Sequence, residues 1–457
     1  MMIRTDFEAP PWLNNLSDYF SSKNHQLYLV GGAVRDQLRA QAVREWDLTT
    51  DARPPQIERL LKELGAKQIG RLGERFGTIT ATLDGEPLEI TTFRGEHYLP
   101  DSRLPEVTFG DNLADDLARR DFTINAIAFD ISAKRLVDNF NGQVDLTHKL
   151  IRAVGNPVER FFEDPLRMLR AVRFASQFDY TIEETTLAAI SQVRDRFGLL
   201  SAERVAAEMD KILLSPVPSV GVNLLTESGL INYILPELLP AVDLEFDPRE
   251  HKDIYHHILQ VLDQTPPKIE LRWCALLHDI AKPLTRRKID GQYHFLGHEI
   301  IGAKMTREIL GRLRYSGDFI KYVSNLVRFH QRLPNYTGDW SHGGIRRFVR
   351  DAGNLLDDLF LFAEADSTGS NEAKKLHYRS LRQQLRDQID ELNRQAEIAK
   401  IKSPLDGMEL MAIFNRPAGP WIKPVKEHLL ALVLDGELAA EDKERATVIA
   451  RQLVSLK

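Results

Sequence analysis

Residues 28–50 read YLVGGAVRDQLRAQAVREWDLTT, and this stretch sets the organisation of the chain. A short apolar run at 27–30 predicts a β-strand, and a helix-compatible segment at 33–40 follows the glycine pair. Gly31 and Gly32 would let backbone N–H groups approach a phosphate closely, and the start of the following helix favours negative charge. On its own, a glycine pair is more often a structural turn than a phosphate site.

The same stretch ends in a second predicted strand, at 45–49, which carries Glu45 and Asp47 on either side of Trp46. Side chains alternate along a strand, so the two carboxylates point to the same side. They repel each other unless a cation lies between them, and oxygen ligands of this kind suit Mg²⁺. Such a pair alone is more often a solvated strand face. The order of strand, glycine pair, helix with Arg35 and acidic strand favours a phosphate cradle beside a metal site.

The composition is that of an ordinary globular protein, with 43% hydrophobic and 28% charged residues among 457. This length predicts three or four domains. The single cysteine, Cys274, excludes an intrachain disulfide and suits a reducing compartment. We find no signal peptide and no apolar run long enough to span a membrane, so we expect a cytoplasmic protein. The net charge of −6 argues against a general nucleic-acid coat protein but permits a local basic surface.

The first 150 residues mix strands and helices, which predicts an α/β or α+β head on a mixed sheet. Besides the two strands above, strands are expected at 77–83, 88–93 and 126–130, and a helix at 55–64. The polar segment between Phe93 and Arg119 holds two prolines and has no clean period. A connection of this length inside a compact domain is usually functional or mobile.

Helical periodicity replaces the strand signals from Pro157 onward, so the rest of the chain is expected to be all helix. The clearest predicted helices are 160–178, 183–196 and 202–214. Proline-bearing breaks at 235–248, 265–267 and 403–404 are candidate domain boundaries.

A double arginine precedes the last predicted strand of the head, in the sequence RRDFTIN at 119–125. Arg119 and Arg120 could hold a triphosphate, and Asp121 or Asn125 could read a ribose hydroxyl. The alternative is a basic strand entrance with a capping aspartate.

A second basic motif, EDPLRMLRAVR at 163–173, begins a predicted helix. Arginines at 167, 170 and 173 could form only an exposed stripe, strengthened by a Glu163–Arg167 pair. However, Asp164 and Arg167 could also read a base. Cytosine and adenine each present an amine donor beside a ring-nitrogen acceptor, which a carboxylate and a guanidinium match. Uracil and guanine present the opposite pattern.

The motifs LVGGAVRD, EWD, RRDFTINAIA and EDPLRMLRAVRFA, in this order, resemble the bacterial-type (class II) tRNA nucleotidyltransferase and poly(A) polymerase family. The resemblance covers most of the chain. It implies an α+β nucleotidyltransferase head with a mixed sheet, followed by an all-helical neck, body and tail.

The resemblance also implies a role for each motif. Binding of the catalytic metal, Mg²⁺, would fall to Glu45 and Asp47. The triphosphate would be held by Gly31, Gly32 and Arg35, and the ribose sensed by Arg119, Arg120 and Asp121. A protein template for CTP and ATP would consist of Asp164 and Arg167, supported by Arg170 and Arg173.

One position departs from the family pattern, which usually has aspartate where this chain has Glu45. Glutamate can still bind Mg²⁺, although its extra methylene moves the carboxylate by about one bond, so we expect activity to be retained. Glu89 on a neighbouring strand is a candidate third acid. The segment 97–113 resembles the family's flexible loop associated with the switch from C to A addition, which favours an enzyme that can add A.

Histidines concentrate in the middle of the chain, and their pattern resembles the HD metal-phosphohydrolase superfamily. The candidate ligands are His257, His278, Asp279, His298, His330 and Asp366. Imidazole and carboxylate ligands suit Mn, Ni, Fe, Zn or Mg, and such a site would activate water and clamp a phosphate. Any one of these histidines alone is more often packed or exposed than a ligand, and some sites of this superfamily are idle.

The resulting division has four parts: head at 1–150, neck at 151–240, HD body at 241–370 and tail at 371–457. The tail carries basic residues on predicted helices and resembles the family region that holds the elbow of tRNA. Residue by residue, a solvated mixed-charge surface would explain it equally well.

The sequence therefore predicts an enzyme that adds CCA to the 3′ end of tRNA from CTP and ATP without a nucleic-acid template. Alternatives within the family are an A-adding or CC-adding enzyme and a poly(A) polymerase. Alternatives outside it are a phosphohydrolase that acts on RNA ends and a non-catalytic tRNA-binding protein. We expect a monomer or a homodimer without a membrane partner.

Overall fold

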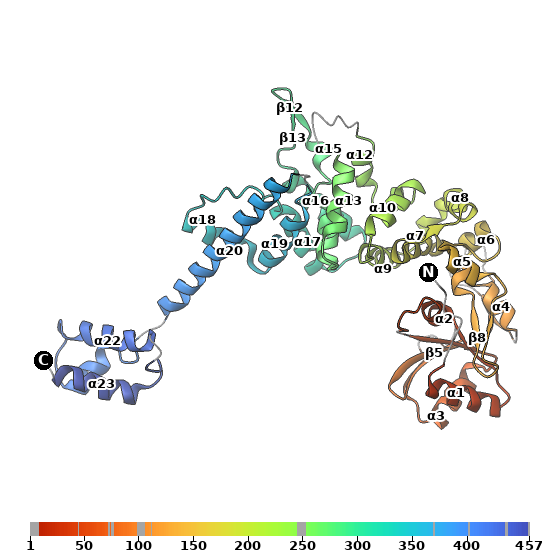
Figure 1. Cartoon of the computed structure of the whole chain (residues 1–457), viewed down its shortest axis with the longest axis horizontal. Coiled ribbons are helices and arrows are strands. Elements are labelled where there is room, and N and C mark those ends of the chain that lie inside the picture. Colours follow the sequence, from red (N-terminus) through yellow and green to blue (C-terminus); the bar gives the residue numbers. More distant parts are fainter. Residues whose placement is uncertain are drawn as a thin grey trace. The chain divides into compact units, whose positions relative to one another are not determined.

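The structure is a computed structural model that describes residues 9–43, 45–71, 74, 77–97, 106–110, 112–244, 253–368, 371–400, 403–434 and 437–455. It contains two compact units (Figure 1). The first consists of Met1–His330 with Leu361–Thr368, and the second of Gln331–Phe360 with Gly369–Lys457.

A seven-stranded mixed sheet forms the head, with strand order β3-β4-β5-β2-β1-β8-β9. The strands are β1 (Leu27–Val30), β2 (Trp46–Thr50), β3 (Lys67–Gly70), β4 (Thr78–Leu83), β5 (Glu86–Thr92), β8 (Ala128–Asp130) and β9 (Arg135–Val137). The β2–β5 pair is parallel, whereas β1 is antiparallel to both of its neighbours. The predicted mixed sheet is confirmed, and β1 has the predicted bounds.

The glycine pair lies at the junction between strand and helix. Helix α2 (Gly31–Leu38) follows β1 without a connecting loop, because Gly31 has a φ of +66°, a left-handed conformation that glycine adopts at little cost. The helix therefore starts before the predicted 33–40. On the far side, β2 begins at Trp46 rather than Glu45. The buried Trp46 ring packs edge-on against Trp12.

Two further helices cover the sheet (Figure 1). Helix α1 (Pro11–Ser22) packs against β1, and α3 (Pro54–Glu63) packs against β4 and β5. Helix α3 was predicted at 55–64. Proline occupies the first turn of both helices, where its missing N–H would have no helical partner in any case.

Part of the segment between Phe93 and Arg119, predicted to be an irregular connection, is regular structure. β6 (Arg94–His97) and β7 (Glu106–Phe109) form an antiparallel pair, and α4 (Leu113–Ala118) follows them. Residues 98–105 and 111 lie outside the described residues.

Helices dominate the rest of the first unit, as expected. The longer ones are α6 (Pro157–Glu163), α7 (Leu166–Phe178), α8 (Glu184–Val193), α9 (Ala202–Leu213), α10 (Pro218–Glu227), α13 (Ile254–Gln264), α14 (Ile269–Leu277), α16 (His298–Arg312) and α17 (Gly317–Phe329). The predicted single helix at 160–178 was wrong, since it is two helices. Asp164 precedes a proline and is extended, with φ −133° and ψ 103°, so α6 ends there.

The expectation that strands end before Pro157 was also wrong in detail. β11 (Thr181–Ile182) pairs with β10 (Leu150–Ile151), and β12 (Arg287–Ile289) pairs with β13 (Gln292–His294). Such short strands carry too few residues for a periodic signal. The Asp290-Gly291 turn, in which both residues have positive φ, is nevertheless a recognisable hairpin signal.

The second unit is helical in its described residues. Its main helices are α18 (His342–Ala352), α20 (Glu372–Lys400), α21 (Gly407–Phe414), α22 (Ile422–Leu434) and α23 (Lys443–Ser455). The last three enclose a small apolar core that includes Leu410, Leu429 and Ala450. None of the described helices is both long and apolar enough to cross a membrane.

Close packing in the neck makes Gly221 a sensitive position. A Cβ on Gly221, in α10, would lie 2.4 Å from Cγ2 of Ile212 and 3.2 Å from Oγ of Ser176. A Cβ on Gly311, in α16, would have no neighbour within 4 Å. Gly221→Ala should therefore destabilise the protein by about 1–3 kcal/mol, whereas Gly311→Ala should stabilise it by about 0.5–1 kcal/mol.

Urea denaturation measures both effects as shifts of the midpoint in opposite directions, at an unchanged slope. A Gly221→Ala midpoint equal to or above that of the wild type would contradict the packing.

Candidate active site and metal centre

A cavity of about 650 Å³ in the first unit gathers the residues predicted to bind the nucleotide or its metal, apart from the candidate third acid, Glu89, which is not among its lining residues. These residues are Gly31, Gly32, Arg35, Glu45, Asp47, Arg119, Arg120, Asp121, Asn125, Asp164, Arg167, Arg170 and Arg173. They come from α2, from the start of β2, from 119–125 and from 164–173, so segments far apart in the sequence meet at one place.

Acidic side chains form one wall of this cavity. Asp47 on β2 is the register partner of Glu89 on the parallel strand β5, and Glu45 lies immediately before β2. Burial raises the pKa of Asp47; Arg120 opposes this rise and Glu45 adds to it. Desolvation also raises the pKa of Glu89, and the carboxylates of Asp47 and Glu45 raise it further. Acids that disfavour one another's charge in this way are suited to hold a divalent cation.

The glycine pair packs directly against these site residues. A Cβ on Gly31 would lie 2.9 Å from Nη1 of Arg120, and a Cβ on Gly32 would lie 3.6 Å from Oδ2 of Asp47. The N–H of Gly32 donates to the Asp47 carboxylate. Glycine at position 31 thus gives Arg120 its place beside the acids, in addition to any contact with a phosphate.

Arg119 and Arg120 share one buried partner, Asp116. Its two oxygens accept from Arg119 at 2.6 Å and from Arg120 at 3.1 Å. Burial alone would raise the pKa of Asp116, but the two guanidinium groups outweigh burial and lower it. Asp116 therefore remains charged and fixes both arginines at the cavity.

Asp121 anchors a network that runs from the head to the neck. Its carboxylate accepts from the N–H of Phe122 at 2.8 Å, from Nδ2 of Asn125 at 3.0 Å and from Nε of Arg170 at 2.7 Å. Asn125 in turn accepts from Nη1 of Arg35 at 2.7 Å. Burial would raise the pKa of Asp121, yet Arg170 holds it well below its usual range.

Arg35 and Arg173 complete the arginine wall. The guanidinium of Arg35 also pairs with Asp36 at 2.8 Å and lies over the ring of Phe178. Arg173 lies 3.1 Å from Glu208 and over the ring of Phe174, and burial lowers its pKa to about 10. These contacts fix the arginine positions before any ligand enters.

Asp164 and Arg167 both border the cavity, but each has another partner. Asp164 accepts from the N–H of Leu166 at 3.1 Å and from Arg204 at 2.9 Å. Arg167 donates to Glu163 at 2.6 Å and to the carbonyl of Arg119 at 2.8 Å. The predicted Glu163–Arg167 pair is therefore present, and Arg167 is buried rather than part of an exposed stripe.

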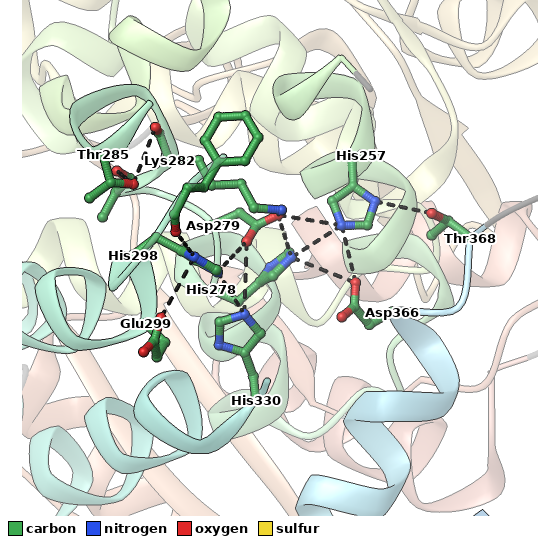
Figure 2. Close-up of polar contacts among 12 residues, drawn as sticks. His257, His278, Asp279, Lys282, Thr285, His298, Glu299, His330, Asp366 and Thr368 are labelled. Atoms are coloured by element: carbon green, nitrogen blue, oxygen red, sulfur yellow. Dashed lines mark hydrogen bonds and ion pairs between the residues drawn. The ribbon is translucent and has the colours of Figure 1, made fainter. Parts of the chain in front are cut away.

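The candidate HD ligands form a second centre in the first unit (Figure 2). His257, His278 and Asp366 make one triad, and Asp279, His298 and His330 make another. In each triad, one ligand atom per residue lies within 4.8 Å of the others. The members of the second triad are all buried, whereas His257 and Asp366 are half-buried, so we name the two groups the open triad and the buried triad.

Backbone carbonyls fix the tautomers of three of these histidines. Nδ1 of His278, His298 and His330 lies 2.8, 2.6 and 2.6 Å from the carbonyls of Ala275, Phe295 and Val327. A carbonyl only accepts, so each Nδ1 carries a proton. Burial lowers the pKa of His298 and His330, so Nε2 of these two neutral rings presents a lone pair. Burial would lower the pKa of His278 as well, but the Asp279 carboxylate raises it.

Within the buried triad, these lone pairs converge. Nε2 of His298 lies 3.3 Å from Nε2 of His330, a contact in which neither neutral ring can donate. Burial lowers the pKa of His330 to about 3, so this ring stays neutral. A cation between the rings would satisfy both nitrogens.

The Asp279 carboxylate faces both triads. Its Oδ2 lies 3.2 Å from Nε2 of His278 and 3.5 Å from Nε2 of His257, whereas Oδ1 lies 3.4 Å from Nε2 of His298. Oδ1 is buried and has no hydrogen-bond partner among the residues that the structure describes. Desolvation would raise the pKa of Asp279, but the cationic neighbours hold it well below its usual range. Imidazole nitrogens and carboxylate oxygens together form a donor set that would fit a divalent cation at each triad.

Three protein families match parts of the chain in succession. The poly A polymerase head domain matches residues 27–152, the probable RNA and SrmB-binding site of polymerase A matches 179–242, and the HD domain matches 254–394.

Similar proteins extend the match to nearly the whole chain. A CCA-adding enzyme from Enterococcus faecalis is 30% identical over 94% of this chain and 92% of its own length. The chain belongs to the tRNA nucleotidyltransferase family. An A-adding tRNA nucleotidyltransferase from Deinococcus radiodurans is 32% identical over 92% of this chain and 94% of its own length. A solved CCA-adding enzyme from Bacillus stearothermophilus, in complex with CTP, shares the fold: the TM-score is 0.61 at 24% identity, and 98% of this chain and 99% of that chain are covered.

Membership of the tRNA nucleotidyltransferases makes the chain an enzyme, and this family generally uses a divalent metal. The predicted family, α+β fold class and HD body are confirmed. The roles given to single residues stay predictions.

Three charged residues at the cavity escaped the sequence analysis: Arg94 and Arg204, which line it, and the buried Asp116, which holds two of its arginines. Asp116 lies three and four residues before Arg119 and Arg120, a helical spacing that could have revealed the pairing. Arg204, which pairs with Asp164, lies forty positions away on α9. Only the packing of α9 against α7 brings it to the cavity.

Proposed function

We propose that this tRNA nucleotidyltransferase adds C, C and A to the 3′ end of tRNA, using CTP and ATP and no nucleic-acid template. One observation carries the proposal: a single cavity joins the acids on β2, the arginines and the Asp164–Arg167 pair. Relatives named CCA-adding enzymes support it.

Glu45 and Asp47 are proposed to hold the catalytic metal, Mg²⁺, with Glu89 close by. Mutually destabilised carboxylates and hard oxygen ligands fit this ion. When bound there, Mg²⁺ supplies activation of the tRNA 3′-hydroxyl and charge neutralisation on the leaving pyrophosphate. Glu45 lies just before the first residue of β2 and is exposed. Its side chain, one methylene longer than aspartate, therefore has room to bring the carboxylate to the place that an aspartate carboxylate takes in the family.

The triphosphate is proposed to bind along Arg35, Arg119 and Arg120. Asp116, Asp36 and Asn125 hold these guanidinium groups in fixed orientations, which lowers the entropy lost when a nucleotide binds. Asp121 is proposed to act on the ribose side mainly through Asn125 and Arg170, because its own oxygens are already engaged.

Base selection is proposed to rest on Asp164 and Arg167. The carboxylate would accept from the amine of cytosine or adenine while the guanidinium donates to the ring nitrogen. Arg204 now holds Asp164 and Glu163 now holds Arg167, so these partners keep the charges paired until a base replaces them. Arg170 and Arg173 support this wall.

A different reaction within the family is addition of A alone, since the relative from Deinococcus radiodurans bears the name of an A-adding enzyme. Addition of CC alone and synthesis of poly(A) are two more reactions that a member of this family could perform. The residues expected to govern the switch from C to A include 98–105, outside the described residues.

Transcripts of one tRNA that end at the discriminator base, at C and at CC separate these functions. With CTP, ATP and Mg²⁺, we expect all three to be completed to CCA and then to stop. Extension of only the CC transcript would establish an A-adding enzyme, and continued A addition would establish a poly(A) polymerase. If none of the three transcripts were extended, a non-catalytic tRNA-binding protein would be the remaining function.

The same assay tests the metal ligands. Asp47→Asn should abolish incorporation while tRNA binding, measured by filter retention, stays within about twofold of the wild type. Asp84→Asn, in the exposed turn between β4 and β5, is the control and should retain full activity.

Removal of the Arg167 side chain should loosen base choice. We expect Arg167→Ala to lower the preference for CTP over UTP by about 10–100-fold in kcat/KM, the discrimination typical of a bidentate contact. Arg135→Ala, in the head but exposed, should leave the preference unchanged. Equal selectivity in the wild type and Arg167→Ala would refute the template role.

A second function is proposed for the HD centre: metal-dependent hydrolysis of phosphate esters at RNA ends. Two observations support it: the converging lone pairs of His298 and His330, and Oδ1 of Asp279, which has no hydrogen-bond partner among the described residues. Bound ions, whether Mn, Ni, Fe, Zn or Mg, would supply an activated water and a clamp for phosphate oxygens.

Metal counting tests this centre. In the Asp47→Asn chain, which lacks a ligand of the head metal site, we expect two Mn²⁺ by equilibrium dialysis. Adding His330→Ala to that chain should weaken one of them by more than about 100-fold. His256→Ala is the matched control, because this exposed neighbour of His257 pairs with Asp253 instead.

Hydrolysis of 2′,3′-cyclic phosphate ends should survive Asp47→Asn and disappear in Asp279→Asn. Full metal binding by His330→Ala, or hydrolysis that depends on Asp47, would contradict an independent HD site.

We also propose the four-part division at 1–150, 151–240, 241–370 and 371–457, with the helical tail holding the body of tRNA. A cytoplasmic location and a monomeric or homodimeric state remain predictions.

A further inference from the structure

Lys282 reaches into the HD centre from the first residue of α15 (Lys282–Thr285), one turn after Asp279 (Figure 2). Its Nζ lies 2.5 Å from Oδ2 of Asp279, and its side chain is 20% exposed. The ammonium also lies 5.6 Å from the ring centre of Phe295.

Lys282 contacts Oδ2 of Asp279, and this oxygen faces two histidines of the open triad. Oδ2 of Asp279 lies 3.2 Å from Nε2 of His278 and 3.5 Å from Nε2 of His257. A divalent ion at the open triad would draw on the same oxygen as the ammonium. Two cations this close repel each other strongly in a poorly hydrated site, so they compete.

The ammonium group of Lys282 borders a cavity into which it can move. A cavity of about 320 Å³ is lined by Ile254, His257, Lys282, Phe295 and Asp366. His257 and Asp366 belong to the open triad, whereas the buried triad lies beneath it. A substrate phosphate that reaches the metal centre through this cavity must therefore pass Lys282, the one cation among the described lining residues.

We propose that Lys282 is the phosphate-binding residue of the HD site, and that it occupies Asp279 only while the open triad holds no metal ion. The proposal rests on the hydrolase function proposed above and names its substrate class, a nucleotide phosphate ester. Lys282 binds the phosphate and the half-buried Phe295 ring provides an aromatic surface beside it.

Two properties follow from this exchange. The buried triad fills first, because Lys282 contacts Oδ2 of Asp279, whereas His298 and His330 face the other oxygen, Oδ1. The open triad binds its ion more weakly, because the ion must displace Lys282. Phosphate strengthens this second site, since it gives the displaced ammonium a partner, and linkage requires the metal to strengthen phosphate binding equally.

The test measures Mn²⁺ binding by equilibrium dialysis in the full chain, with and without inorganic phosphate. Every protein compared carries Asp47→Asn, so that the head site does not contribute, and the chain with Lys282 unchanged serves as the wild type. Lys282→Met should tighten the weaker Mn²⁺ site by at least about tenfold, which corresponds to 1.4 kcal/mol, and leave the tighter site unchanged. Phosphate should tighten the weaker site in the wild type but not in Lys282→Met.

Lys304→Met, which removes an equally charged but exposed side chain from α16, is the control and should change neither site. Lys282→Gln, which keeps a hydrogen-bond donor near Asp279 but not the charge, should also tighten the weaker site and serves if the methionine variant does not fold.

Unchanged or weaker Mn²⁺ binding in both Lys282 variants would overturn the exchange while leaving the metal centre intact. Absence of any Mn²⁺ binding in the wild type would overturn the HD metal centre itself, and the exchange with it. The two failures are therefore distinguishable.

Discussion

The buried Asp121 carboxylate is the contact on which the nucleotide cavity depends. It joins the end of the head sheet to α7 through Asn125 and Arg170, and Asn125 extends the link to Arg35. A buried charge is tolerated only when it is paired and hydrogen-bonded, so the head and the neck must meet in this one geometry. The acids on β2 and the arginines of α7 consequently face each other across the same space.

The two centres of the first unit handle buried charge in opposite ways. In the nucleotide cavity, the arginines discussed above have carboxylate or carbonyl partners, which keeps them in place until a nucleotide arrives. In the HD centre, Nε2 of His298 and Nε2 of His330 converge on Oδ1 of Asp279, an oxygen that accepts no hydrogen bond from any described residue. The first arrangement is preorganised for an anionic substrate, and the second for cations.

The sequence predicted those features of the fold and the site that depend on local residue patterns. The strand before the glycine pair, the mixed sheet and the gathering of the motif residues all followed from spacing and family resemblance. Three features needed the tertiary structure. Pro165 breaks a helix that periodicity alone makes continuous, Arg204 reaches Asp164 only by helix packing, and Asp121 turns inward to hold Arg170 rather than standing open to a ribose. The convergence of lone pairs on Asp279 depends on backbone carbonyls that no side-chain pattern reveals.

The most direct measurement is anomalous diffraction from crystals grown with CTP and Mn²⁺. The account predicts a manganese peak within ligand distance of Glu45 and Asp47, with the cytosine edge in contact with Asp164 and Arg167. A manganese peak away from both acids, or a cytosine bound outside this cavity, would contradict it.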